Sequence, residues 1–162
     1  MFEKLLKLLK YYRKTWLTNS VRLHYSQFGE DIILKELLKK NITDGFFVDV
    51  GCYHPIKFSN TYRLYKKGWS GINIDMEADK IKLFTIARKR DINVLSPVSD
   101  CSEEVTITRY SRYGLGSTID EQVAKDKPQT IYDQQVMQAK TLNAILADTK
   151  YHNRPIDVLS ID

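Results

Sequence analysis

The stretch GFFVDVGCYHP, residues Gly45–Pro55, decides the fold. Its apolar residues form a short run around a single acid, Asp49, and the run stops at Gly51. A short apolar run of this kind is typical of a strand that is buried on both faces of a parallel sheet. The glycine lets the backbone approach a ligand closely because it has no Cβ. We therefore expect Phe46–Val50 to be a strand whose carboxyl end carries a binding site.

The chain on either side of this stretch alternates between helical and strand patterns. Helical patterns cover Ser26–Lys40, Ser59–Lys67, Ala78–Arg90 and Lys140–Asp148, and strand patterns cover Phe46–Val50, Gly71–Asp75, Ile92–Val98, Val105–Thr108 and Ile156–Ile161. The segment Gly114–Pro128 is polar and is expected to be a loop. Strands separated by helices indicate βαβ units and a parallel sheet. The sequence therefore predicts an α/β fold.

Length and composition bound the class of protein. A chain of 162 residues suits one domain, and a hydrophobic fraction of 43% is enough for a core. Cys52 and Cys101 are the only cysteines, so the sequence offers neither a disulfide framework nor a CxxC metal pair. We expect no metal site, and a reducing cytoplasm is the simplest location.

The formal net charge of +5 belongs to the N-terminal segment. Six of the 25 basic residues and one of the 20 acidic residues lie in residues 1–24, which leaves 19 of each sign in the rest. A domain with balanced charge argues against a nucleic-acid partner. The same boundary separates a basic N-terminal helix, residues 1–24, from a domain that spans residues 25–162.

The segment FEKLLKLLKYYRKTWL predicts an amphipathic helix. One face carries apolar and aromatic residues, namely Phe2, Leu5, Leu8, Leu9, Tyr12 and Trp16, and the other carries basic residues, namely Lys4, Lys7, Lys10, Arg13 and Lys14. The lysines keep every apolar run far short of the ~18 residues of a membrane span, and the segment lacks the apolar core of a signal peptide. Two alternatives remain: the helix packs on the domain or a partner, or it lies on an anionic membrane surface.

Acids at the ends of the first two strands predict a nucleotide site. Asp49 and Gly51 end the first strand, and Asp75 ends the second strand 24 residues after Gly51. A carboxylate there can accept hydrogen bonds from ribose hydroxyls, and the interval is close to the ~20 residues of nucleotide-binding βαβ units. A simple turn after Asp49 and a helix cap by Asp75 are the alternatives. A dinucleotide site is disfavoured, because its glycine fingerprint would require glycine where Tyr53 and Ile56 stand.

Four longer segments occur in one order: YSQFGEDIIL (Tyr25–Leu34), FVDVGCYHPIKFSNTYRLYKKGWSGINID (Phe47–Asp75), DINVLSPVSD (Asp91–Asp100) and IDVLSID (Ile156–Asp162). In these segments the chain resembles the FkbM-type methyltransferases, which use S-adenosylmethionine. The resemblance covers most of residues 25–162 and does not extend to the N-terminal helix. It implies a Rossmann-like methyltransferase fold, with a parallel sheet and flanking helices.

The resemblance also implies roles for residues at the ends of the strands. Asp49 and Gly51 match the first methyltransferase motif, where the backbone meets the methionine part and the ribose of S-adenosylmethionine. Asp75 matches the acid that holds the ribose hydroxyls, a position where family members often carry glutamate. Ser99 and Asp100 follow the third strand, where such enzymes contact adenine.

Further candidates lie outside this set. Gln27 and Glu30 of the SQFGED segment are expected to close the site, although their helix could equally be structural. The catalytic base is not identified, and His54 and Asp162 are the candidates for it. His54 has no partner acid in the sequence, so a role in filling its loop is the alternative.

The resemblance implies O-methylation of a sugar or a secondary metabolite, with a small-molecule or glycan acceptor. The alternatives are a non-catalytic cofactor-binding module and a scaffold that is peripheral to the inner face of a membrane. An NAD-dependent oxidoreductase is disfavoured for lack of the glycine fingerprint.

The last expected strand ends at Asp162, whereas the family continues from a sequence like LSID into a V-E-G turn. We therefore expect a sheet that is incomplete at the C-terminus and leaves one edge of Ile156–Ile161 bare. A bare apolar edge favours self-association, so the chain is expected to oligomerise and to transfer methyl groups poorly.

Overall fold

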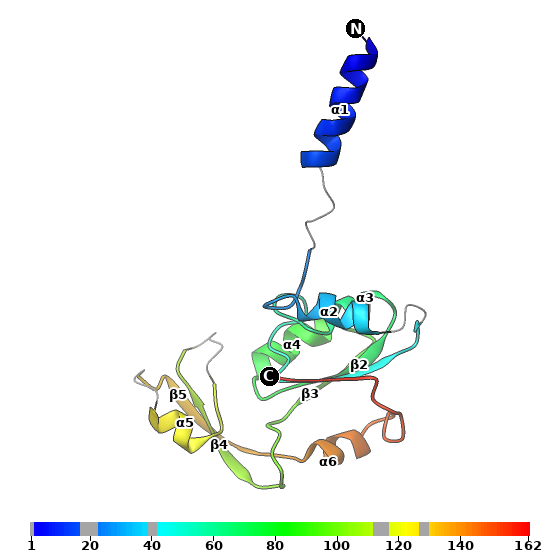
Figure 1. Ribbon diagram of the computed structural model, residues 1–162. Coiled ribbons are helices and arrows are strands. Elements are labelled where there is room, and N and C mark those ends of the chain that lie inside the picture. Colours follow the sequence, from blue (N-terminus) through cyan, green and yellow to red (C-terminus); the bar gives the residue numbers. More distant parts are fainter. Residues whose placement is uncertain (1, 17–22, 39–41, 112–116, 127–129) are drawn as a thin grey trace.

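A four-stranded parallel sheet forms the centre of the molecule (Figure 1). The computed structural model describes residues 2–16, 23–38, 42–111, 117–126 and 130–162. Within these residues the sheet consists of β1 (Phe46–Val50), β2 (Ser70–Asp75), β3 (Ile92–Leu95) and β6 (Val158–Ile161), in the order β3-β2-β1-β6. All neighbouring strands are parallel, which confirms the predicted α/β fold with a parallel sheet.

Helices cover both faces of this sheet, because β1 alternates its side chains between them. Phe46 and Val48 point to one face and pack with Ile145 of α6 (Leu142–Ala147). Phe47 points to the other face and packs with Leu64 of α3 (Tyr62–Lys66). The same face also carries α2 (Glu30–Leu37) and α4 (Ala78–Ala87), opposite α6 in Figure 1. Every residue of β1 except its last is therefore buried.

The segment before α2 forms a turn held by Ser26. The sequence predicted a helix from Ser26, but α2 begins at Glu30. The Ser26 hydroxyl oxygen accepts hydrogen bonds from the backbone N–H groups of Gly29 and Asp31, at 3.1 and 3.2 Å, and the hydroxyl donates to the Asp31 carboxylate at 2.8 Å. Ser26 thus holds the turn before α2 and also accepts an N–H from the first turn of the helix, without standing at its N-cap position.

An antiparallel pair, β4 (Glu104–Arg109) and β5 (Asp133–Gln138), forms a separate sheet. The sequence pattern predicted the first strand of this pair and missed the second, because the side chains of β5 are mostly polar and exposed. The expected loop Gly114–Pro128 is wrong for Glu121–Asp126, which forms helix α5. The Asp120 carboxylate accepts the N–H groups at the start of this helix, and residues 112–116 and 127–128 lie outside the described residues.

Helix α1 (Phe2–Trp16) forms the first part of the N-terminal segment, whose residues 23 and 24 are described and are not helical, and residues 17–22 lie outside the described residues. Every side chain from Phe2 to Thr15 is exposed, so the alternative in which this helix packs on the domain is not what the structure has. In Figure 1 the helix stands apart from the sheet and its covering helices. Among the described helices, none has both the length and the apolar character that crossing a bilayer requires.

Strand β6 is paired with β1 and has no second neighbour among the described strands. Val158 is buried, whereas Leu159 and Ile161 are 49% and 66% exposed. Among the described strands β6 is thus an edge strand with exposed apolar side chains, as the sequence predicted for Ile156–Ile161. A hollow of about 350 Å³ runs between β6 and α2, and its apolar lining includes Ile33 and Leu34. Self-association through this edge stays a prediction.

Candidate functional site

The turn after β1 lies where the strand order reverses, since β2 and β6 flank β1 on opposite sides. Such a switch point is the usual ligand site of an open parallel sheet. Gly51 has a left-handed φ of 75°, and a Cβ there would lie 2.6 Å from the backbone oxygen of Asp162. The backbone N–H groups of Gly51 and Cys52 both donate to the carbonyl oxygen of Ile74, at 2.9 and 3.2 Å. The glycine is therefore required by the close approach of Asp162, which follows β6, and by the turn itself.

The carboxylate of Asp75 meets this turn at the end of β2. Its two oxygens accept hydrogen bonds from the backbone N–H groups of Tyr53, at 3.1 Å, and of Glu77, at 2.9 Å. The ammonium of Lys80 lies 3.6 Å away. Asp75 is only 5% exposed, and this burial raises the pKa of its carboxyl. The structure thus brings Gly51 and Asp75 together as the sequence predicted, and Asp75 also fixes the start of α4.

Asp49 lies inside the molecule rather than at the edge of the sheet. Its side chain is on the face that α3 covers, where the hydroxyl of Thr61 donates to it at 2.7 Å. Burial raises the pKa of the Asp49 carboxyl to about 6, although hydrogen bonds from Thr61 and Ser160 act in the opposite direction. A ligand at the sheet edge would therefore meet the backbone near Asp49 and not its carboxylate.

A buried arginine that the sequence did not reveal holds the segment between β1 and α3. Arg88 has no exposed surface, and its guanidinium donates to the carbonyl oxygen of Pro55 at 2.9 Å. It also donates to the hydroxyls of Ser59, at 2.8 Å, and Thr61, at 3.1 Å, and pairs with the Asp91 carboxylate at 3.5 Å. Thr61 in turn donates to the Asp49 carboxylate, so these hydrogen bonds connect Arg88 to β1.

The same segment contains two residues in a backbone conformation that side chains rarely adopt. Tyr53 and Phe58 have φ angles of 47° and 56°. Backbone strain of this kind persists only where neighbouring contacts impose it, and it clusters at ligand sites. The carboxylate of Asp75, which holds the N–H of Tyr53, and the Arg88 network supply those contacts. These contacts hold the turn after β1 in its strained conformation at the carboxyl edge of the sheet.

A hollow of about 280 Å³ lies against residues 76–79, the segment that follows Asp75. Its walls come from the link after β2, the start of α4, the end of β3 and the β4–β5 pair: Met76, Glu77, Ala78, Asp79, Leu95, Arg109, Tyr132, Asp133, Gln135 and Met137. Arg109 organises its polar side, because the guanidinium pairs with Glu77 at 2.8 Å and with Asp133 at 2.9 Å. None of the site residues predicted from the sequence lines this hollow. Half of its lining comes from the β4–β5 pair, and the sequence pattern did not predict β5.

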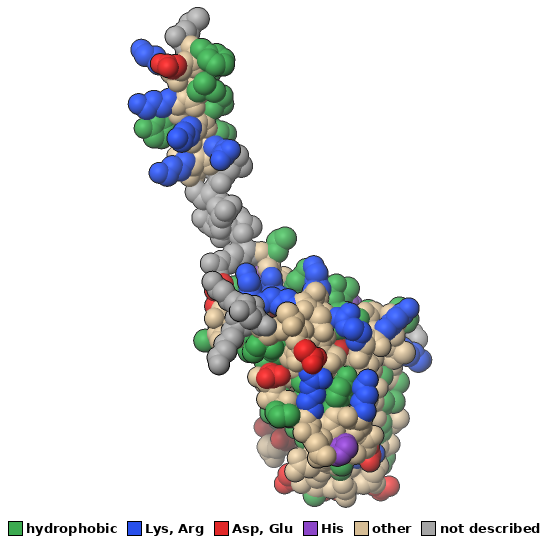
Figure 2. Space-filling model, turned by 90° about the vertical axis from the view of Figure 1, so that its right-hand side faces the viewer, with side chains coloured by type: hydrophobic (Ala, Val, Ile, Leu, Met, Phe, Trp, Pro, Cys, Tyr) green, Lys and Arg blue, Asp and Glu red, His purple; other side chains and the backbone are tan. Residues whose placement is uncertain are grey.

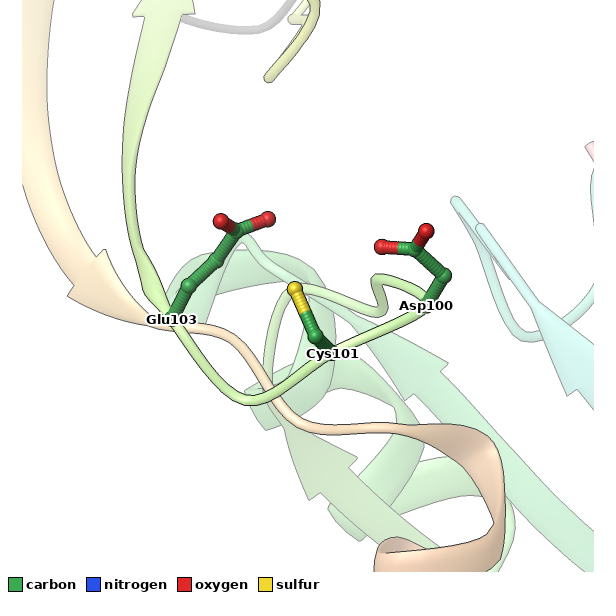
Figure 3. Close-up of side chains that lie close together, drawn as sticks. All are labelled: Asp100, Cys101 and Glu103. Carbon is green, nitrogen blue, oxygen red and sulfur yellow. The ribbon is translucent and has the colours of Figure 1, made fainter.

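The candidates after β3 lie in an exposed loop. The Ser99 hydroxyl donates to Asp100 at 3.3 Å and to Glu103 at 3.1 Å, and its N–H donates to the carbonyl oxygen of Lys140 at 3.2 Å. Asp100, Cys101 and Glu103 offer ligand atoms within 4.8 Å of one another (Figure 3). All three are exposed, and the hydrogen bond to Glu103 raises the pKa of the Cys101 thiol to about 11. We assign no ion to this group, because metal binding requires the thiolate.

The remaining candidates are divided between two places. Gln27 is exposed in the turn before α2 and lines neither hollow. Glu30 and Asp162 line the hollow along β6, and burial, followed by repulsion from Glu30, raises the pKa of Asp162. His54 holds its own turn, because its Nδ1 atom accepts hydrogen bonds from the N–H groups of Ile56, at 3.1 Å, and Lys57, at 2.9 Å.

The geometry of His54 bears on its use as a base. With Nδ1 accepting two N–H groups, the proton of the neutral ring is on Nε2, so no free lone pair faces outward. Burial, and then the charge of Lys57, lower the pKa of the ring. His54 therefore suits the loop-filling alternative better than general-base catalysis, and Asp162 is the remaining candidate of the two.

The buried carboxyls make stability depend on pH in a definite direction. Burial raises the pKa values of Asp49 and Asp91 from 3.8 to about 6, so the folded chain binds their protons more tightly than the unfolded chain. The free energy of unfolding should therefore fall as pH rises from about 4 to about 6, by on the order of 2 kcal/mol for each group, and then level off.

Urea unfolding at closely spaced pH values measures this dependence. Asp49→Asn should flatten the fall between pH 4 and 6, whereas Asp44→Asn, at an exposed carboxyl, should leave it unchanged. Asp31 does not interfere in this interval. Burial alone would raise the pKa of Asp31, but hydrogen bonds from Arg63 and Ser26 lower it below its ordinary value. The stability that ionised Asp31 contributes is therefore lost only at a pH more acid than this interval. Equal pH slopes for the wild type and Asp49→Asn would contradict the account.

Comparisons with protein-family models, with curated proteins and with solved structures gave no match for this chain. The fold and the geometry of the site are therefore the basis for a functional assignment. They define an α/β protein whose parallel sheet holds a buried acid, Asp75, against a glycine turn at its switch point.

Proposed function

We propose that the chain is a Rossmann-like methyltransferase domain that binds S-adenosylmethionine at the carboxyl edge of its sheet. The observation that carries the proposal is the contact between the Gly51–Tyr53 turn and the Asp75 carboxylate. The turn presents backbone without a Cβ at its first position, and the acid provides acceptors for ribose hydroxyls. The resemblance to FkbM-type methyltransferases also implies that Gly51 and Asp75 contact the cofactor.

The groups present fit the nucleoside part of this cofactor. A carboxylate has about four acceptor positions, and the two N–H groups on Asp75 leave room for hydroxyl donors. The hollow that begins at Met76, the residue after Asp75, has a volume of about 280 Å³, which is near the ~300 Å³ lower bound of small-molecule sites. Met76 and Leu95 offer apolar surface for a base, and Gln135 offers an amide for its polar edge.

The second hollow suits the acceptor. It lies on the other side of the Gly51 turn, along β6, and two carboxyls line it together with apolar side chains. When bound, the cofactor supplies an electrophilic methyl group for in-line displacement by an acceptor oxygen. We assign to Asp162 the removal of the acceptor proton, because its raised pKa increases its affinity for a proton near neutral pH. A sugar or secondary-metabolite hydroxyl is the acceptor class that the resemblance implies.

Calorimetric titration of the chain with S-adenosylmethionine, S-adenosylhomocysteine and NAD⁺ tests the proposal. We expect the two adenosyl compounds to bind and NAD⁺ not to bind. Asp75→Asn keeps the shape of the side chain and loses its charge, so it should weaken binding by about 1–3 kcal/mol. Asp44→Asn, at an exposed carboxyl just before the amino end of β1, is the matched control and should bind as the wild type does.

Three outcomes are informative. Equal affinity in Asp75→Asn and the wild type would contradict the ribose assignment, provided that thermal unfolding shows both to be folded. Binding of NAD⁺ but not of the adenosyl compounds would contradict the whole proposal. Binding of S-adenosylmethionine without methyl transfer to any hydroxyl acceptor would favour the non-catalytic cofactor-binding module.

A further inference from the structure

We propose that α1 docks the chain on an anionic lipid surface, with its apolar face in the headgroup region and its lysines on the lipid phosphates. Three observations carry this inference: the segregation of side chains around α1, the position of the chain's charge surplus, and the length of the helix. None of them depends on the cofactor proposal.

The side chains of α1 are sorted onto two faces, and all of those described are exposed. Apolar and aromatic side chains gather mostly on one side of the helix and basic side chains on the other (Figure 2). The exposed apolar set is Phe2, Leu5, Leu6, Leu8, Leu9 and Tyr12. Exposed apolar residues on one continuous face mark an interaction surface. Its partner must therefore offer apolar contact along the whole helix.

The charges of α1 identify the chemistry of that partner. Residues 1–24 hold six basic residues and one acid, whereas the rest of the chain holds 19 of each sign. The domain therefore offers no excess of negative charge that would draw α1 onto it. Arg13 falls at the boundary between the two faces, where a long basic side chain can reach headgroup phosphates while its stem stays apolar. Apolar contact flanked by positive charge is what an anionic bilayer surface complements.

The length of α1 sets its orientation. Fifteen residues give a helix of about 22 Å, which is shorter than the ~30 Å hydrocarbon core. The lysines at Lys4, Lys7 and Lys10 also recur along its length, so no orientation across the bilayer would leave them in water. The helix is therefore expected to lie in the plane of the interface.

Vesicle sedimentation of the full chain tests this inference. We expect binding to vesicles of phosphatidylcholine mixed with phosphatidylserine, weaker binding to phosphatidylcholine alone, and a decline as salt rises. Leu5→Gln with Leu9→Gln should weaken binding about 30-fold or more by removing the centre of the apolar face. Tyr11→Gln replaces an exposed aromatic residue on the basic side and should leave binding nearly unchanged.

The charge requirement has its own matched pair of variants. Lys7→Gln with Lys14→Gln should weaken binding to the anionic vesicles roughly 25-fold, at about fivefold for each lysine. Lys35→Gln with Lys89→Gln removes the same charge from exposed positions on the domain and should have little effect. Equal losses in the two pairs would overturn the assignment to α1.

Other results would also overturn the proposal. These are no binding to anionic vesicles, binding that does not depend on salt, or binding that survives Leu5→Gln with Leu9→Gln. If the full chain instead oligomerises without vesicles, and the same leucine pair abolishes that association, the apolar face serves a protein contact. Circular dichroism of each variant checks that the domain stays folded.

Discussion

Arg88→Met is expected to lower the free energy of unfolding by about 3–5 kcal/mol, because it leaves a buried charge without its partner. Arg88 is fully buried and is paired with the Asp91 carboxylate, whose side chain is also fully buried. The substitution also removes the donors to the carbonyl oxygen of Pro55 and to the Ser59 hydroxyl. Methionine fills much of the space, so the loss reports on pairing rather than on a cavity.

Two further variants separate pairing from packing. Lys89→Met makes a similar change at the next residue, which is exposed, and should change stability by no more than about 0.5 kcal/mol. Asp91→Asn should recover part of the loss when it is combined with Arg88→Met, because it removes the carboxylate that the first change leaves unpaired. Urea unfolding measures all of these. Additive losses in the double variant, or a loss below about 1 kcal/mol in Arg88→Met, would contradict a paired, buried arginine.

Trp69→Ala is expected to cost about 3–5 kcal/mol, as removal of a large buried side chain does. Trp69 is 1% exposed and packs with Phe47 and Leu64 between the sheet and α3. Its indole N–H donates to the carbonyl oxygen of Ile42 at 2.9 Å. The ring fills the space beside Gly45, where a Cβ would lie 2.2 Å from it.

Phe28→Ala is the matched control for this prediction. It removes an aromatic ring that is 81% exposed and should change the free energy of unfolding by no more than about 0.5 kcal/mol. Thermal and urea unfolding of both variants give the comparison. A cost for Trp69→Ala close to that of Phe28→Ala would mean that the ring is not part of a packed core.

The elements that the sequence predicted are those whose burial leaves a local pattern. The apolar runs of β1 and β2 stand out because parallel strands are buried on both faces. Strand β5 and helix α5 leave no such pattern, because their described side chains are mostly exposed. Their formation depends on the backbone pairing of β5 with β4 and on the Asp120 carboxylate at the start of α5. The sequence pattern therefore located the main sheet and missed half of the smaller one.

The residues of the candidate site also differ in whether a local sequence pattern could predict their positions. The sequence predicted that Gly51 and Asp75 lie close together, because each ends a strand and the carboxyl ends of parallel strands lie at one edge of the sheet. Arg88 could not be predicted in the same way, since an arginine late in a helical pattern is normally solvated. Its burial depends on Pro55 and Ser59, which lie about 30 residues earlier in the chain.

The central claim, an adenosyl cofactor at the carboxyl edge of the sheet, is tested most directly by amide hydrogen exchange with and without S-adenosylhomocysteine. We expect slower exchange in the Gly51–His54 turn, at Glu77 and in residues 96–100 when the compound is bound. Exchange around Asp157, which binds the amino end of β1, should not change. Unchanged exchange at the carboxyl edge in the presence of saturating compound, or protection confined to other parts of the chain, would contradict the assignment.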